Sequence, residues 1–190
     1  KVRKMLDEAG MTECKIVVSN SLDEYIIRDL LHQGAIIDSF GVGERLVTSK
    51  SEPVFGGVYK LVAVEEKDGS IVPKIKISEN AQKITNPHFK KVYRLYDRES
   101  GKAEADYLCV YDESVNDNEP LTIFDPVHTW KEKTLTNYRA EELLKPIFIS
   151  GKLVYERRSV KEIRDFCAQQ IDTLWDEVTR FENPHKYYVD

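Results

Sequence analysis

Two short apolar runs, each followed by small or polar residues, place the strongest constraint on how this chain can fold. Cys14–Ser19 leads into Asn20-Ser21, and Ala35–Phe40 leads into Gly41-Val42-Gly43. The segment between them, Leu22–Leu31, carries apolar residues at helical spacing. Because two buried strands joined by a helix pair in parallel through a right-handed crossover, this pattern predicts one βαβ unit.

A further helix is predicted before this unit. Val2–Ala9 places its apolar residues on one face, so the chain opens with helix, strand, helix and strand. That rhythm is typical of an α/β barrel or a doubly wound sheet. Ser21 and Glu24 predict a capping box for the second helix. Only Lys1 precedes Val2 and it cannot cap a helix, so we expect the chain to be the later part of a longer protein.

After Pro53 the sequence changes to pairs of strands separated by turn residues. A second capping box, Ser159 with Glu162, predicts one long closing helix that ends before Asn183-Pro184. The predicted hairpins pair Val58–Glu65 with Ile71–Ile77, Val92–Tyr96 with Tyr107–Tyr111, and Leu143–Ile149 with Leu153–Glu156. The predicted buried face of the closing helix consists of Val160, Ile163, Cys167, Ile171, Leu174, Trp175, Val178 and Phe181.

Charge and composition argue against several classes of protein. The formal net charge is −5 and the isoelectric point is about 5.5, whereas nucleic-acid-binding domains usually present a basic face. No apolar run approaches the roughly 18 residues that a membrane span requires. Cys14, Cys109 and Cys167 lie far apart and suggest neither disulfides nor a zinc site. We therefore expect a cytoplasmic protein without a nucleic-acid or membrane partner and without a metal site of its own.

The strongest chemical signal is Gly41-Val42-Gly43-Glu44 at the end of the second predicted strand. Glycines allow positive φ angles, so that successive N–H groups can converge on an anion, and a helical turn starting at Glu44 adds free N–H groups. Ser19-Asn20-Ser21 is expected at the neighbouring strand end, and two adjacent loops of this kind suit a sugar phosphate. A plain tight turn explains the same spacing, and the residues alone leave both readings open.

The histidines do not indicate catalysis. His32, His88, His128 and His185 are scattered and have no partner at catalytic or metal-binding spacing, so we interpret each as structural or surface-exposed. The loop around His128 is expected to pack Trp130 against another domain.

The sequence also resembles the C-terminal portion of nicotinate phosphoribosyltransferases, in order from Lys1 to Asp190. The resemblance implies formation of nicotinate mononucleotide and diphosphate from nicotinate and 5-phosphoribosyl 1-diphosphate, driven by ATP hydrolysis with Mg²⁺, in NAD biosynthesis. It also implies a homodimer. The stretches that carry it are KVRKMLDEAG, KIVVSNSLDEYII, GAIIDSFGVGERLVTS, PVFGGVYKLVAVE, KISENAQKITNP, PLTIFDPVHTWK and SVKEIRDFCAQQIDTLWDEVTRFENPHKYYVD.

For the fold, the resemblance implies an α/β protein. Residues 1–80 would be the last βα units of an irregular, TIM-like α/β barrel. Residues 81–190 would form a mostly antiparallel β appendage with the closing helix.

For the site, the resemblance implies that two loops hold the 5-phosphate of the ribosyl substrate. Many relatives have Thr where this chain has Glu44, so only the backbone N–H is expected to contribute there. Catalytic and base-binding residues are expected upstream, and none is assigned to this chain. The alternative is a non-catalytic sugar-phosphate-binding or oligomerisation module. The expected phosphate-binding residues are Ser19, Asn20, Ser21, Gly41, Val42, Gly43 and Glu44.

Overall fold

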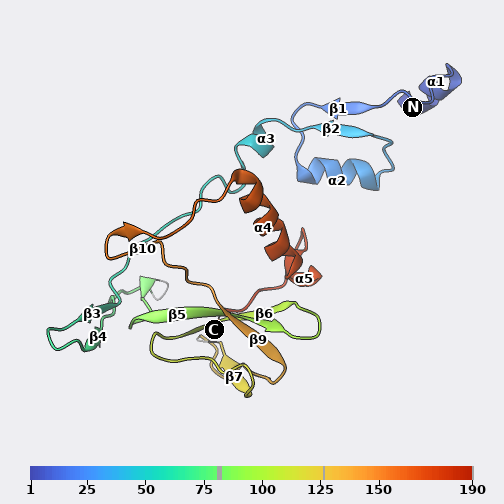
Figure 1. Ribbon diagram of the computed structural model, residues 1–190. Coiled ribbons are helices and arrows are strands. Elements are labelled where there is room, and N and C mark those ends of the chain that lie inside the picture. The colour runs from blue at the N-terminus through green and yellow to red at the C-terminus, as the bar shows by residue number, and fades with distance from the viewer. Residues whose placement is uncertain (81–82, 126, 190) are drawn as a thin grey trace. The chain divides into compact units, whose positions relative to one another are not determined.

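The computed structural model describes residues 1–80, 83–125 and 127–189, which form two compact units (Figure 1). The first unit is Lys1–Tyr59 and the second is Lys60–Asp190. The domain boundary expected between residues 80 and 81 stays a prediction.

The first unit contains the predicted βαβ arrangement. Its two strands pair in parallel, with Val17 opposite Ser39 and Ser19 opposite Gly41. The unit is confirmed, although both strands are shorter than expected; the barrel to which it would belong stays a prediction. The elements of this unit are α1 (Val2–Glu8), β1 (Val17–Ser19), α2 (Glu24–His32), β2 (Ser39–Gly41) and α3 (Glu44–Val47).

Side-chain bonding explains why the two strands are short. The N–H of Ile16 donates to Asp38 Oδ2 at 2.8 Å, while the N–H groups of Asp38 and Ser39 both donate to the Ile16 carbonyl. These bonds replace the regular ladder, which begins one residue later. The bond from the Ile16 backbone, aided by Lys15, lowers the pKa of Asp38. Asp38 therefore fixes the N-terminal end of the strand pair, opposite to the end where the two loops begin.

The capping box predicted for α2 is wrong. Asp23 is the N-cap, and its carboxylate accepts the N–H of Ile26 at 2.8 Å. Ser21 lies two residues earlier with φ at +51°, in a conformation that belongs to the preceding loop. Either Ser21 or Asp23 could serve as an N-cap by residue type, and the conformation of the preceding loop leaves Asp23 in that position.

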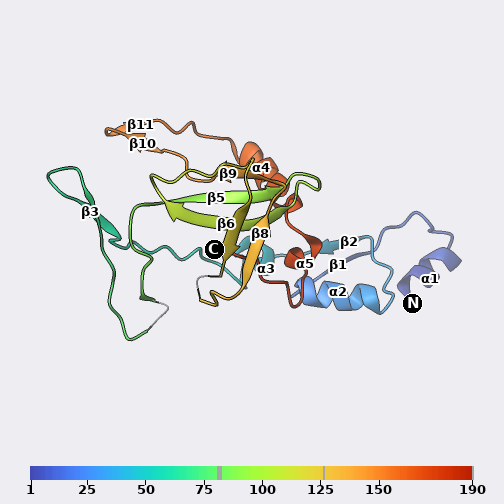
Figure 2. The ribbon, with the colours of Figure 1, turned by 90° about the horizontal axis from the view of Figure 1, so that it is seen from below.

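The second unit is built mainly of antiparallel strands, and its sheet has the order β6-β5-β9. The β7–β8 hairpin runs across the direction of β5 and β6 (Figure 2). Two further hairpins, β3–β4 and β10–β11, complete the strand pairs. The strands are β3 (Ala63–Glu65), β4 (Ile71–Pro73), β5 (Lys90–Asp97), β6 (Ala103–Val110), β7 (Leu121–Phe124), β8 (Glu132–Leu135), β9 (Tyr138–Glu142), β10 (Phe148–Ile149) and β11 (Lys152–Leu153).

One cluster of buried side chains joins the sheet to the β7–β8 hairpin. Tyr138 and Leu95 are its largest fully buried members. The Tyr138 hydroxyl lies within hydrogen-bond distance of two backbone carbonyl oxygens, those of Asn116 and Glu119, each at 3.1 Å. A buried phenol that keeps its hydrogen bonds stabilises the core and fixes the adjoining loop at the same time. The cluster contains Leu95, Ala105, Ile123, Leu135 and Tyr138.

The three predicted hairpins are confirmed with altered bounds, whereas β7, β8 and β9 were not predicted. β8 reads Glu-Lys-Thr-Leu and β9 reads Tyr-Arg-Ala-Glu-Glu, and each buries only one end residue, Leu135 or Tyr138. With a single buried residue, neither strand shows the alternation that identifies a strand from sequence.

The closing helix begins as predicted, since Ser159 and Glu162 form the capping box. It ends early, however: α4 covers Val160–Asp172, and a separate turn, α5, covers Asp176–Thr179. Lys102 Nζ donates to the carbonyls of Asp172 and Leu174 at 2.9 and 2.8 Å, which fastens the helix end to the β5–β6 turn. The fully buried face predicted for this helix is also wrong. Its exposed apolar members include Val160, Ile163, Ile171, Trp175 and Phe181.

An ion pair fastens the C-terminal segment to the sheet. Arg94 donates to both carboxylate oxygens of Asp106, at 2.7 and 2.9 Å, and the Tyr187 hydroxyl donates to the same carboxylate at 3.0 Å. The hydrogen bonds to Asp106 raise the pKa of the Arg94 guanidinium, and burial raises the pKa of Tyr187. Asp106 also forms a parallel bridge with Val189, so the segment continues the edge of β6.

A turn after β7 provides a second attachment. The Asp125 carboxylate is 5% exposed and accepts the N–H groups of Val127 and His128, at 2.8 and 2.9 Å. Lys186 Nζ lies 3.9 Å from the same carboxylate. The bonds from His128 and Val127 lower the pKa of Asp125 to about 2. The carboxylate therefore stays ionised and holds both the turn and the segment around Lys186.

Within the part of the chain that the structure describes, no helix is long and apolar enough to cross a membrane. The thiols of Cys14, Cys109 and Cys167 are all free.

Arg94→Ala should lower the free energy of unfolding by about 2 kcal/mol, a value between those typical of exposed and of buried ion pairs. The Arg94 and Asp106 side chains are 21% and 13% exposed, so the loss leaves a poorly hydrated carboxylate without its partner. Urea unfolding followed by circular dichroism measures the change. The matched control is Lys161→Ala, which removes an 85% exposed cation from an i,i+4 pair and should change stability little. Equal effects of the two substitutions would contradict the attachment role of Arg94.

Asp125→Asn should destabilise the protein at neutral pH. The difference in stability between the variant and the unaltered protein should shrink as the pH falls from about 4 to about 2. The folded pKa of Asp125 is lowered, so the carboxylate contributes stability above the unfolded pKa and loses it as the folded pKa is approached. Thermal unfolding at a series of pH values measures this. Asp165→Asn, in an exposed pair with Lys161, serves as the control and should show a small difference at every pH.

Candidate functional site

The parallel register brings the two predicted loops together. Ser19 lies opposite Gly41, so the segments that follow β1 and β2 leave the same edge of the strand pair. A Cβ on Gly41 would stand 2.9 Å from the Cβ of Ser19, closer than real side chains approach. Only glycine therefore allows this spacing, and the two loops start in contact.

The backbone of the first loop is unusual. Asn20 has φ at +91° and Ser21 has φ at +51°, two consecutive non-glycine residues in the left-handed region. Such conformations cost about 1 kcal/mol or more each and cluster at ligand sites. The next residue, Leu22, is buried, with 6% exposure, and anchors the loop. Left-handed residues were expected in the glycine loop. That expectation is wrong, because Gly43 has φ at −101°. The left-handed residues lie in the first loop instead.

The second loop presents an open helix start. Gly43 is the N-cap of α3 and provides no capping side chain. The N–H groups of Leu46 and Val47 donate to the Gly43 carbonyl. The N–H groups of Glu44 and Arg45 lie in the first turn, where α3 itself provides no acceptor for them. A Cβ built on Gly43 meets nothing within 4 Å, so the space beside this residue is open.

Charged side chains around the loops are partly neutralised. The Glu44 carboxylate pairs with Lys50 Nζ at 3.2 Å, so the acid beside the helix start has its own counter-charge. Arg45 lies 3.8 Å from Asp23, the residue that caps α2, and so links the two loops. The Arg45 side chain is 44% exposed and brings a cation to the edge where an anion would bind. In the sequence, the only signal for this cation is its position two residues after Gly43.

This arrangement suits binding rather than bond-making. It offers backbone N–H donors, hydroxyls and one cation, which are the groups that hold a phosphate. The nearby carboxylates of Asp23 and Glu44 are already paired. Over residues 1–80, 83–125 and 127–189, no three His, Cys, Asp or Glu side chains gather to hold a metal ion.

The remaining sequence candidates lie elsewhere. His32 ends α2, and His128 packs edge-on against Trp130 with ring centroids 5.1 Å apart. Trp130 itself is 74% exposed. Trp175, expected inside a long helix, is instead the N-cap of α5. Both tryptophans line one cavity in the second unit, which local sequence patterns do not reveal because the two residues are 45 positions apart.

Comparison with known proteins places this geometry in a family. Residues 89–190 match the nicotinate phosphoribosyltransferase C-terminal domain. The chain is 46% identical over 190 residues to nicotinate phosphoribosyltransferase of Bacillus subtilis (strain 168), covering 100% of this chain and 39% of that protein. It is 35% identical over 182 residues to the Dictyostelium discoideum nicotinate phosphoribosyltransferase, covering 92% of this chain and 30% of that protein.

A solved structure supports the fold. The chain superimposes on the crystal structure of human nicotinic acid phosphoribosyltransferase with a TM-score of 0.66 and 24% identity, over 99% of this chain and 33% of the human chain. The chain thus spans two fifths or less of the proteins that it matches. The chain belongs to the nicotinate phosphoribosyltransferase family.

Proposed function

We propose that this chain is the C-terminal part of an enzyme that forms nicotinate mononucleotide and diphosphate from nicotinate and 5-phosphoribosyl 1-diphosphate, with ATP hydrolysis, in NAD biosynthesis. Within that enzyme, the two loops of the first unit hold the ribose 5-phosphate. The observation that carries this proposal is the parallel register of Ser19 and Gly41 beside the uncapped start of α3.

The residues divide the work by chemistry. Gly41, Val42 and Gly43 bring backbone close to the phosphate oxygens, and the N–H of Glu44 donates at the start of α3. Ser19, Asn20 and Ser21 face the same phosphate from the neighbouring strand end, with hydroxyl and amide groups. The carboxylate of Glu44 takes no part, because Lys50 pairs with it.

The 5-phosphate does not react, and this determines what the loops contribute. Transfer of the ribosyl group develops positive charge on the sugar while diphosphate leaves. Binding energy gained at a remote phosphate positions the reacting carbon against nicotinate, which lowers the barrier to the chemical step. The chain thus supplies orientation, and the groups that act on the reacting atoms belong to the upstream part of the enzyme.

Further features of the whole enzyme follow from the family resemblance. ATP and Mg²⁺ act in the upstream part, since the carboxylates beside the loops are already paired. Mg²⁺ neutralises charge on the leaving diphosphate when bound. The enzyme is a cytoplasmic homodimer whose first unit completes a TIM-like barrel.

Gly43→Ala in the full-length enzyme should weaken binding of 5-phosphoribosyl 1-diphosphate at least about tenfold and leave the melting temperature nearly unchanged. We expect the added methyl group to hinder the approach of the phosphate to the backbone at Gly43, and one lost charge-assisted bond is worth about 1.5–3 kcal/mol. Nothing in the protein lies within 4 Å of that methyl group, so folding is spared. Isothermal titration and thermal unfolding measure both quantities.

Two matched substitutions complete this experiment. Gly41→Ala should lower the melting temperature, because its Cβ clashes with Ser19. Glu44→Ala should leave the affinity unchanged or slightly higher, because the backbone donor remains. Unchanged affinity in Gly43→Ala would favour the oligomerisation alternative, in which this turn binds no sugar phosphate.

The 190-residue chain alone should form no nicotinate mononucleotide. It contributes two parallel strands, β1 and β2, whereas a closed barrel requires about eight. Chromatographic detection of the product after incubation with all substrates tests this, with the full-length enzyme as positive control. Product formation by the purified chain would show that the catalytic groups lie within it.

A further inference from the structure

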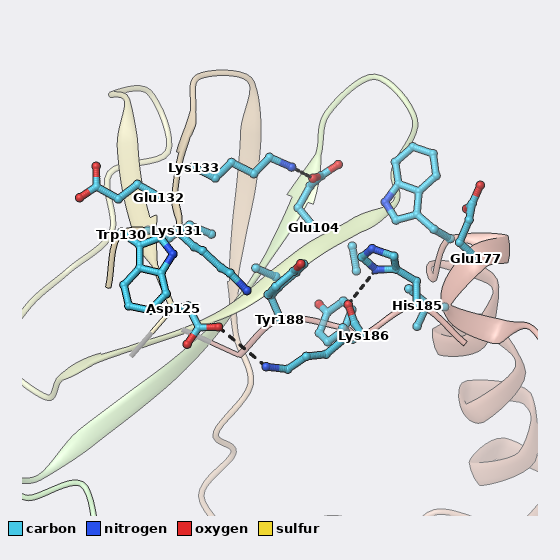
Figure 3. A pocket seen from close by; sticks show the side chains of 16 residues that line it. Glu104, Asp125, Trp130, Lys131, Glu132, Lys133, Glu177, His185, Lys186 and Tyr188 are labelled. Carbon is cyan, nitrogen blue, oxygen red and sulfur yellow. Dashed lines mark hydrogen bonds and ion pairs between the residues drawn. The ribbon is translucent and has the colours of Figure 1, made fainter. Parts of the chain in front are cut away.

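Both tryptophans of this chain lie in the second unit, where they line one cavity of about 750 Å³ (Figure 3). The cavity lies between the β6 edge, the β7–β8 hairpin, α5 and the segment around Tyr188. Its volume is in the range of small-molecule sites. It belongs to a different unit from the phosphate loops.

The floor of this tryptophan cavity is apolar and well ordered by packing. Ala103, Ala105 and Ile123 are exposed by only 1%, 1% and 3%. The walls are aromatic and accessible, with Trp130 74% exposed and Trp175 39% exposed. Large aromatic faces open to solvent above a buried floor favour a flat ring as the ligand, because stacking removes apolar area from water on both partners.

Two lysines of the cavity are paired, whereas Lys131, Glu132 and Glu177 have no ion-pair partner among the residues that the structure describes. Lys133 pairs with Glu104, and Lys186 lies 3.9 Å from Asp125. Lys131 Nζ has no ion-pair or hydrogen-bond partner among the residues that the structure describes.

Figure 3 shows the direction of these side chains. Lys131 reaches toward Tyr188, across the space beside Trp130, whereas Glu132 and Glu177 point away from it. An unpaired ammonium group beside exposed aromatic rings attracts an anionic group on a bound ring.

We propose that the tryptophan cavity binds a planar aromatic molecule that carries a carboxylate or a phosphate. The ring packs against Trp130 or Trp175, and the anionic group contacts Lys131 Nζ.

The test is isothermal titration of the full-length protein with 2-naphthoate and, in a second arm, 2-naphthyl phosphate. Binding of either probe is expected with a dissociation constant below about 1 mM, and the arm that binds more tightly identifies the preferred anion. Trp130→Ala and Lys131→Glu should each weaken binding about tenfold. Lys161→Glu makes the same charge change on α4, away from the cavity, and should leave binding unchanged. Gly43→Ala should also leave it unchanged, which separates this site from the phosphate loops.

Several results would overturn the proposal. They are absence of heat with both probes, equal binding by the neutral 2-naphthalenemethanol, and unchanged affinity in both cavity variants. Acrylamide quenching, with Trp130→Phe to identify the signal of this residue, gives a further check. If Trp130 is shielded from acrylamide in the full-length protein, another part of the protein fills the cavity and the ligand site does not exist.

Discussion

The contact between Ser19 and Gly41 determines where every candidate phosphate donor of the first unit lies. Because no side chain separates the two strands at this point, the loops that follow them begin side by side. Asp38 closes the other end of the strand pair through Ile16, so the register has little freedom to shift. The ends of two strands, rather than any single motif, therefore create the anion-binding edge.

The second unit is organised differently, because distant segments of the chain complete its sheet. Arg94 lies on β5, Asp106 on β6 and Tyr187 near the end of the chain, yet all three meet at one carboxylate. The Asp125 turn adds a second attachment through Lys186. These polar attachments determine the wall of the tryptophan cavity, since Tyr188 and His185 line it.

Much of this could be predicted from the sequence. The parallel pair, the hairpins and the capping box at Ser159 follow from local patterns that the three-dimensional structure preserves. The errors arise where a distant group decides the local structure. Lys102 donates hydrogen bonds to the carbonyls at the end of α4, and the apolar periodicity of the helix does not predict this contact. The left-handed residues Asn20 and Ser21 were likewise invisible, because propensity assigns such angles to glycine. The cavity could not be predicted, because residues 130 and 175 are distant in sequence and line it together only in the folded chain.

The attachment of Tyr187 to Asp106 has a consequence for biosynthesis. The two residues are separated by 81 positions, so the edge of β6 remains unsatisfied until nearly the whole second unit has left the ribosome. During that interval β6 exposes unpaired backbone groups, the kind of surface that promotes association between nascent chains. Closure of a loop this long is also entropically unfavourable and slow to occur by chance. Residues 187–189 thus cover the edge of β6 at Asp106, and this contact can form only after they have been synthesised.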